Sequence, residues 1–288
     1  MNLRLAGHET FYPRQQWLQK GIAFLPELYG NTDHPTDQLG VGINMVRSIR
    51  HWIKAFELVE NGQRTPLAED LLARDPTLSA PATAWILHHT LASSETHATA
   101  WHWFFCHSGL QSFTKAQFVS GLDRFIAGQT NQKYAARSLE RDFDVLVRMY
   151  AERPDEEGAR DSVFYPSVFA DLGLIRHNRF HNRYLRVQDP PVPPAVFHYC
   201  LLDFTRRRFP DAAVIDLDLV RTLPGAPFLT FGVGMTAYIE LHARLSPALH
   251  RKIALSHTAG MHTIAFGRTK KNELLDAAYR DSTASCLL

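Results

Sequence analysis

The clearest hydrophobic pattern in the chain lies between residues 38 and 60. Four apolar residues recur there at the spacing of one helix face: Val46, Ile49, Ile53 and Phe56. The polar residues fall largely on the opposite side, with Arg50 at its edge: Asn44, Arg47, Ser48, His51 and Lys54. The pattern therefore predicts an amphipathic helix with a polar outer face.

The segments on either side of this helix extend the pattern to a winged helix. Gly40 and Gly42 lie in a short run that is typical of the turn in a helix-turn-helix. Residues 60–66 contain Asn, Gly and Pro and predict a short turn, and residues 67–73 predict another helix. Helix, glycine turn, helix, short wing and helix is the order of elements in a winged helix.

A similar order recurs in the middle of the chain. Thr114 is a favoured N-cap type for a helix that runs to about residue 127. Residues 135–150 predict a second amphipathic helix, and residues 168–175 close a third element. Residues 175–187 then predict a β-hairpin, since Asn178 and Asn182 suit turns.

The C-terminal third predicts helices at residues 195–207 and 228–245, a strand at 261–266 and a polar helical tail. A third winged-helix-like unit is an open alternative here. The expected fold is thus mainly α, with tandem winged-helix-like (helix-turn-helix) units that carry short β-hairpin wings.

Polar or proline-rich stretches at residues 108–112, 152–161 and 189–194 predict boundaries between domains. The expected division has three parts. Residues 1–108 form an N-terminal winged-helix-like domain, residues 109–190 a second such domain with a basic hairpin, and residues 191–288 a mostly helical domain.

Composition excludes several classes of protein. The chain has 288 residues, 45% hydrophobic and 21% charged, with a net charge of +2, so it is neither disordered nor histone-like. The chain has three widely spaced cysteines, which suggest neither a disulfide framework nor a metal knuckle: Cys106, Cys200 and Cys286. This use of cysteine fits a protein of the reducing cytoplasm best. No apolar run reaches about 18 residues, and the N-terminus lacks the apolar core of a signal peptide.

The predicted helix at residues 44–54 is the first candidate for DNA contact. A helix that enters the major groove needs polar side chains of the types found on its outer face. An ordinary solvent-exposed helix face has a similar composition, however. An exposed face without a DNA partner is therefore the alternative to DNA contact.

The predicted hairpin is the second candidate. It carries Arg176, Arg179, Arg183 and Arg186, and residues 172–188 contain no acidic side chain. Arginine is well suited to phosphate contacts, although an ordinary polar hairpin is the alternative. The His-Asn pairs in this segment match the spelling of an HNH nuclease motif but not its structure. The active site of an HNH nuclease has its ligands on two strands and a helix, whereas these pairs lie in one short hairpin.

The many histidines between residues 88 and 107 do not have metal-ligand spacing. The tryptophans and phenylalanines around them favour a packed aromatic core.

His8 and Glu9 are the candidate catalytic pair, since a histidine and a carboxylate serve acid-base or metal chemistry. The alternative is a helix that starts at Thr10 or Pro13. Nucleotide-binding, serine-hydrolase and restriction-nuclease motifs are absent from the sequence.

Two segments resemble a bacterial family known as a domain of unknown function, DUF4007. The first is residues 7–21, with the run Gly7-His8-Glu9-Thr10-Phe11. The second is residues 39–52, and further matches occur at 75–76, 83–88 and 101–105. Cys106 stands where an asparagine is expected, and residues 79–81 replace a more acidic stretch. The resemblance spans most of the chain and is densest in residues 7–105.

The resemblance implies a role in DNA phosphorothioate modification. The family occurs beside genes for a cysteine desulfurase, an ATPase and an adenylyl-sulfate-reductase-like protein, and it is similar to the DNA-nicking B component of the Ssp phosphorothioation system. These neighbours are the expected partners, together with DNA. Nicking would call for Mg²⁺ or Mn²⁺. A non-catalytic DNA-binding adaptor and a transcriptional regulator are the alternatives.

Overall fold

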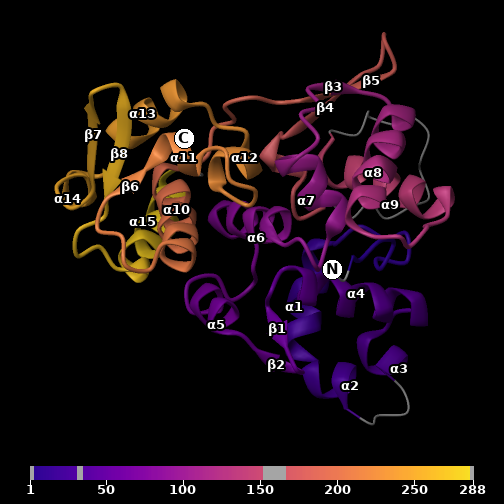
Figure 1. Ribbon diagram of the computed structural model, residues 1–288. Coiled ribbons are helices and arrows are strands. Elements are labelled where there is room, and N and C mark those ends of the chain that lie inside the picture. Colours follow the sequence, from indigo (N-terminus) through magenta and orange to yellow (C-terminus); the bar gives the residue numbers. More distant parts are fainter. Residues whose placement is uncertain (1–2, 31–34, 152–166, 286–288) are drawn as a thin grey trace.

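The protein is described by a computed structural model that covers residues 3–30, 35–151 and 167–285. The described chain is mainly helical, with small antiparallel sheets (Figure 1). This confirms the predicted mainly α class, whereas the winged-helix assignment and the division into three domains stay predictions. The predicted boundary at residues 152–161 lies outside the described residues. Among the described helices, none is long and apolar enough to cross a membrane.

The N-terminal elements follow the predicted order of helix, turn, helix and hairpin. They are α1 (Gln15–Ala23), α2 (Leu25–Tyr29), α3 (Pro35–Leu39), α4 (Ile43–Ala55), β1 (Val59–Glu60), β2 (Gln63–Arg64) and α5 (Pro66–Leu72). Helix α1 packs on α4 at Gly21, where an added Cβ would lie only 2.8 Å from Ile53 and 2.9 Å from Ile49. The helix predicted to begin at Thr10 or Pro13 begins at Gln15 instead.

The middle of the chain contains α6 (Pro81–Ser93), α7 (Thr99–Cys106), β3 (Ser112–Phe113), α8 (Lys115–Gln129), α9 (Ala136–Tyr150), the short helix η1 (Ala170–Leu172), β4 (Ile175–Asn178) and β5 (Arg183–Arg186). Thr114 caps α8 as predicted, and Gln117 completes a capping box with it. The predicted hairpin is formed by β4 and β5, and β3 pairs with the free edge of β5.

The C-terminal elements are α10 (Pro194–Arg208), β6 (Ile215–Asp216), α11 (Leu217–Val220), α12 (Pro227–Phe231), α13 (Met235–Ala243), α14 (Pro247–His250), β7 (Ala254–Thr258), β8 (Met261–Ala265) and α15 (Lys271–Ser285). The single helix predicted at residues 228–245 is wrong. It is divided into α12 and α13 because Gly232 takes a left-handed conformation, with φ +72°, and ends α12.

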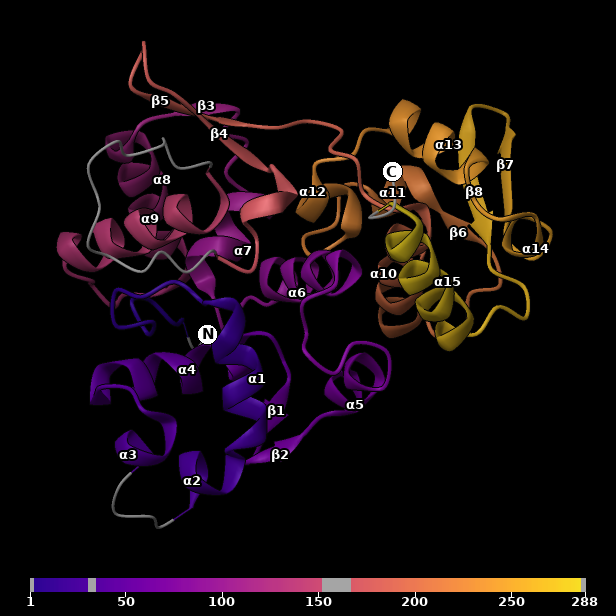
Figure 2. The same ribbon diagram turned by 180° about the vertical axis from the view of Figure 1, so that it is seen from behind.

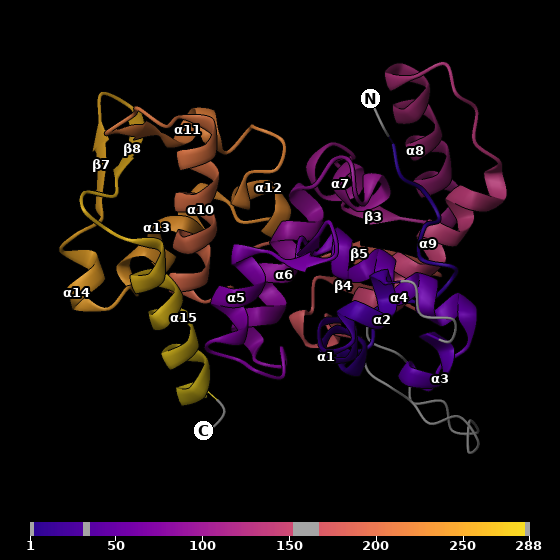
Figure 3. The same ribbon diagram turned by 90° about the horizontal axis from the view of Figure 1, so that it is seen from below.

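Helix α6 lies at the centre of the molecule. It contacts α7 and α12 as well as α10 and α15, so that it joins the C-terminal elements to the rest of the chain (Figures 2 and 3). Most of its side chains are buried, which fits a helix that is apolar all round. His88 is buried on it and bonds to Tyr150 Oη and to the Thr230 carbonyl oxygen, at 2.8 and 2.9 Å.

Candidate functional site

The polar face of α4 is narrower than the sequence predicts. Asn44, Arg47 and Lys54 are exposed and Arg50 is half-buried, but Ser48 and His51 are buried, with 0% and 5% of their surfaces exposed. Ser48 and His51 are therefore not part of the exposed polar face, and their contact with DNA stays a prediction.

The reason for this burial is the segment at residues 4–14, which covers one side of α4. Trp52 donates from Nε1 to the Phe11 carbonyl oxygen at 3.0 Å. Gly7 lies so close to His51 that an added Cβ would be 2.8 Å from its Nδ1 atom. The helix is thus packed against chain on two sides, by α1 and by this segment, and only a strip remains open.

The open strip of α4 is basic. Arg47 and Lys54 are seven residues apart, which places them two turns apart on the same side of the helix. Arg47 donates to Asn44 Oδ1 at 3.4 Å. In the described part of the chain no salt bridge holds Arg47 or Lys54. Both cations are therefore open to an anionic partner.

The register of the β4–β5 hairpin separates its four arginines. Arg176 pairs with Leu185 and Asn178 with Arg183 on one face, while Ile175 pairs with Arg186 and His177 with Tyr184 on the other. The second face packs inward, where the rings of His177 and Tyr184 stack at 4.6 Å and Tyr184 lies against Phe113.

Arg186 is therefore on the inward face of the hairpin, where it is half-buried, and its contact with DNA stays a prediction. Its guanidinium donates to the carbonyl oxygens of Phe105 and Leu229 and lies 5.1 Å from the Phe105 ring. Burial lowers the pKa of Arg186 to about 10, so the side chain keeps its charge at neutral pH. It fastens the hairpin to α7 and α12.

Arg183 is also committed within the chain. It donates to Ser112 Oγ at 2.8 Å, to the Ser112 carbonyl oxygen at 2.9 Å and to Gln117 Oε1 at 3.0 Å. Arg176 and Arg179 remain exposed, and neither forms a salt bridge among the described residues. These two arginines form the basic surface of the hairpin.

His8 is buried, with 1% of its surface exposed, and both of its ring nitrogens are occupied. Nδ1 accepts from the Thr10 backbone N–H at 3.1 Å, so the ring proton lies on Nε2, which donates to Asp142 Oδ1 at 2.8 Å. His8 therefore has neither a free ring nitrogen nor an exposed ring edge, and its catalytic role stays a prediction. Glu9 is partly exposed in the same loop, and its catalytic role stays a prediction.

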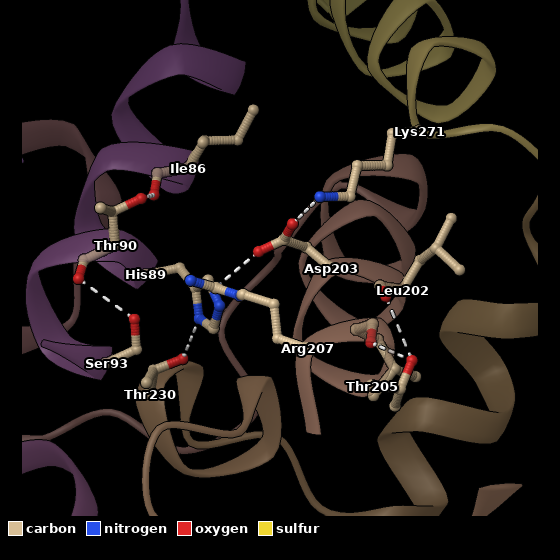
Figure 4. Close-up of polar contacts among 11 residues, drawn as sticks. Ile86, His89, Thr90, Ser93, Leu202, Asp203, Thr205, Arg207, Thr230 and Lys271 are labelled. Atoms are coloured by element: carbon tan, nitrogen blue, oxygen red, sulfur yellow. Dashed lines mark hydrogen bonds and ion pairs between the residues drawn. The ribbon is translucent and has the colours of Figure 1, made fainter. Parts of the chain in front are cut away.

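A charged cleft between α5, α6, α10 and α15 was missed by the sequence analysis. Figure 4 shows Asp203 between Lys271 and Arg207, beside His89. Asp203 pairs with both cations, at 2.5 Å in the case of Arg207. The cleft has a volume of about 180 Å³, and Glu57 and Asp70 also line it.

Burial shifts the pKa values of groups that line this cleft, His89 and Glu57 among them. His89 Nδ1 bonds to Thr230 Oγ1 at 2.9 Å, and its Nε2 atom has no partner among the described residues. Burial lowers the pKa of His89 to about 3 and raises the pKa of Glu57. The spacing of Asp203 and Arg207, four residues apart on one helix, was the available sequence signal, but Lys271 and His89 come from distant segments.

No metal centre is formed by the residues that the structure describes. Among them, no group of three or more His, Cys, Asp or Glu side chains converges so as to hold an ion. The described residues therefore offer no set of three such ligands for Mg²⁺ or Mn²⁺.

Comparison with known proteins gives one family and a consistent structural likeness. The model of a protein family of unknown function, DUF4007, matches residues 5–279. The fold is similar to that of a magnesium ion-bound SspB crystal structure, with 25% identity, a TM-score of 0.82, and coverage of 97% of this chain and 88% of that one. A second SspB crystal structure gives 24% identity, a TM-score of 0.81 and the same coverage. No curated protein matches the chain.

Proposed function

This chain belongs to the DUF4007 family, and we propose that it is the DNA-binding component of a bacterial DNA phosphorothioate modification and defence system. The observation that carries the proposal is a set of exposed basic side chains without salt bridges among the described residues, which are Arg47 and Lys54 on α4 and Arg176 and Arg179 on the hairpin. Unpaired surface cations of this kind bind the phosphate backbone and release its counterions.

The assignment to a phosphorothioation system rests on likeness. The sequence resembles the B component of the Ssp system, and the fold is similar to SspB over 97% of the chain. Under this proposal the protein acts in the cytoplasm with a cysteine desulfurase, an ATPase and an adenylyl-sulfate-reductase-like protein, and it brings DNA to the sulfur-transfer reaction. Its helix-turn-helix at α3 and α4 and its hairpins would act as winged-helix units.

The two basic surfaces are separate, since α8 and α9 lie between α4 and the β4–β5 hairpin (Figures 1 and 2). We therefore propose that each contacts its own stretch of DNA. Substitutions on one surface should weaken binding without abolishing it, which makes the two contributions measurable one at a time.

DNA nicking is the finer form of the proposal. The observation in its favour is that a protein of the same fold has been crystallised with magnesium. A nick would open a strand for sulfur incorporation. The non-catalytic alternatives are an adaptor that docks the sulfur-transfer enzymes on DNA and a transcriptional regulator.

The test is a plasmid assay read beside a gel shift on the same DNA. The purified chain is incubated with supercoiled plasmid, with and without Mg²⁺ or Mn²⁺, and with EDTA as the control. Open-circular product that EDTA abolishes would support the nicking form. A gel shift without nicking would support binding alone and favour the adaptor or regulator. Absence of any gel shift at low salt would contradict the whole proposal.

A further inference from the structure

Phe180 is the most exposed large hydrophobic residue in the described chain. It lies at the turn between β4 and β5, and 91% of its surface is open to solvent. Figures 1 and 2 show this turn extending beyond the neighbouring elements. The ring contributes almost no buried apolar area to folding, so its place at the tip calls for an explanation outside the folded core.

The tip is held in a defined conformation. The His181 backbone N–H donates to Asn178 Oδ1 at 3.1 Å, and Asn182 adopts a left-handed conformation with φ +47°. Below the turn, the stacked rings of His177 and Tyr184 and the hydrogen bonds from Arg183 to Ser112 fix the two strands. Phe180 is thus presented on a braced hairpin, and little further ordering is needed when it meets a partner.

The surroundings of Phe180 are basic. Arg179 precedes it and His181 follows, with the rings of Phe180 and His181 edge to face at 4.8 Å. Arg176 lies on the exposed face of the same hairpin, and residues 172–188 contain no acidic side chain. An aromatic ring among cations matches a partner that has flat apolar surfaces beside negative charges, which describes the bases and phosphates of a nucleic acid.

We propose that Phe180 stacks on a base of DNA whose backbone is held by Arg176 and Arg179, so that the hairpin tip binds best where a base is already unstacked. This proposal rests on the proposed DNA-binding function and adds to it a preference for distorted or partly single-stranded DNA. A second copy of the chain is disfavoured as the partner, because two such tips would bring arginines of like charge together.

The experiment compares DNA affinity on two DNAs that share one strand labelled with a single 2-aminopurine. In one DNA the complementary strand pairs this base with thymine, and in the other it leaves the base unpaired. The wild-type chain should bind the second DNA more tightly and quench its fluorescence. F180A should lose roughly tenfold in affinity for it, the size expected for one base–aromatic stack, and should lose the quenching. F180W should retain both. L185A is the matched control, since Leu185 is a partly exposed apolar residue of the same hairpin away from the tip.

Salt dependence provides the second readout. F180A should leave the slope of affinity against salt unchanged, since a ring releases no counterions, whereas R179A should reduce the slope by about one. Equal binding of F180A and wild type to both DNAs would overturn this inference and leave the proposed function intact. Failure of the wild-type chain to bind either DNA would overturn both. Loss of binding to phosphatidylserine vesicles in F180A, with DNA binding unaffected, would assign the tip to a membrane surface instead and also overturn the inference.

Discussion

His8 and Asp142 are separated by 134 residues in sequence and are joined by a 2.8 Å hydrogen bond in the protein interior. Asp142 Oδ1 also accepts from the Ala6 backbone N–H at 2.9 Å. One carboxylate on α9 therefore holds the segment at residues 6–10, in which Ala6, Glu9 and Thr10 all have positive φ. The segment that looked catalytic in sequence has a structural role: it closes over α4.

Replacement of Asp142 by alanine should destabilise the protein. It leaves the His8 Nε2–H and the Ala6 N–H without an acceptor, at a cost of about 2–4 kcal/mol in the free energy of unfolding. Asp144→Ala is the control, because Asp144 lies on the same helix and forms a half-exposed pair with Lys115 that is worth less than about 1 kcal/mol. Urea denaturation followed by circular dichroism measures both. Equal losses in the two variants would contradict the structural role of Asp142.

Substitutions of two hairpin arginines should have different effects, one on stability and the other on DNA binding. Arg186→Ala removes an inward-facing, half-buried guanidinium and leaves the carbonyl oxygens of Phe105 and Leu229 without a donor, which should lower the free energy of unfolding by about 2–4 kcal/mol. Arg176→Ala should leave stability within about 0.5 kcal/mol of wild type and weaken DNA binding. Thermal melts and a DNA titration on the same preparations check this. If Arg176→Ala were the less stable of the two, the placement of these side chains would be wrong.

Substitutions on α4 give an equivalent contrast. Arg47→Ala combined with Lys54→Ala should weaken DNA binding and lower the slope of log affinity against log salt by about 2, since each cation releases about one counterion. Ser48→Ala, on the buried side of the same helix, should leave the slope at the wild-type value. Fluorescence anisotropy at four salt concentrations gives both slopes. An unchanged slope in the double variant would mean that the outer strip of α4 faces something other than DNA.

Local periodicity predicted several helices, among them α4, α8 and α9, and the β4–β5 hairpin, but not which of their polar faces stay open. The apolar stripe of α4 identifies the side that packs on α1, yet it carries no information about residues 4–14, which bury Ser48 and His51 from the other side. The arginines of the hairpin recur every three or four residues, a spacing that is compatible with exposed DNA contacts or with anchoring inside the protein. Arg186 is held inward by hydrogen bonds to the carbonyl oxygens of Phe105 and Leu229, and both of these residues lie in distant segments of the sequence.

The charged cleft and the break between α12 and α13 have related explanations. The cleft needs His89 on α6, Asp203 on α10 and Lys271 on α15, and no local pattern joins these positions. The break depends on Gly232, which adopts a left-handed conformation that costs glycine little, but a glycine inside an apolar run is equally compatible with a continuous helix. Long-range packing thus decides what the sequence alone leaves open.

Buried histidines should make the protein sensitive to mild acid. Burial lowers the pKa values of His88, His89 and His198 to about 3, against an ordinary value of 6.5. Between these values the unfolded chain binds protons that the folded chain excludes, so stability is fully present above about pH 6.5 and is lost as the pH falls towards 3. Each histidine contributes a slope of about 1.4 kcal/mol per pH unit in this window.

His89→Gln tests one of these contributions. The ring of His89 faces the cleft, so an amide can take its place and still bond to Thr230. Between pH 6 and pH 4 the variant should lose stability less steeply than wild type by about 1.4 kcal/mol per pH unit, because it lacks one titrating ring. Urea denaturation at half-unit pH steps measures the slope, and the spectrum at pH 7.5 verifies the fold. Identical slopes in variant and wild type would show that His89 is protonated in the folded protein, and that its burial does not exclude the proton.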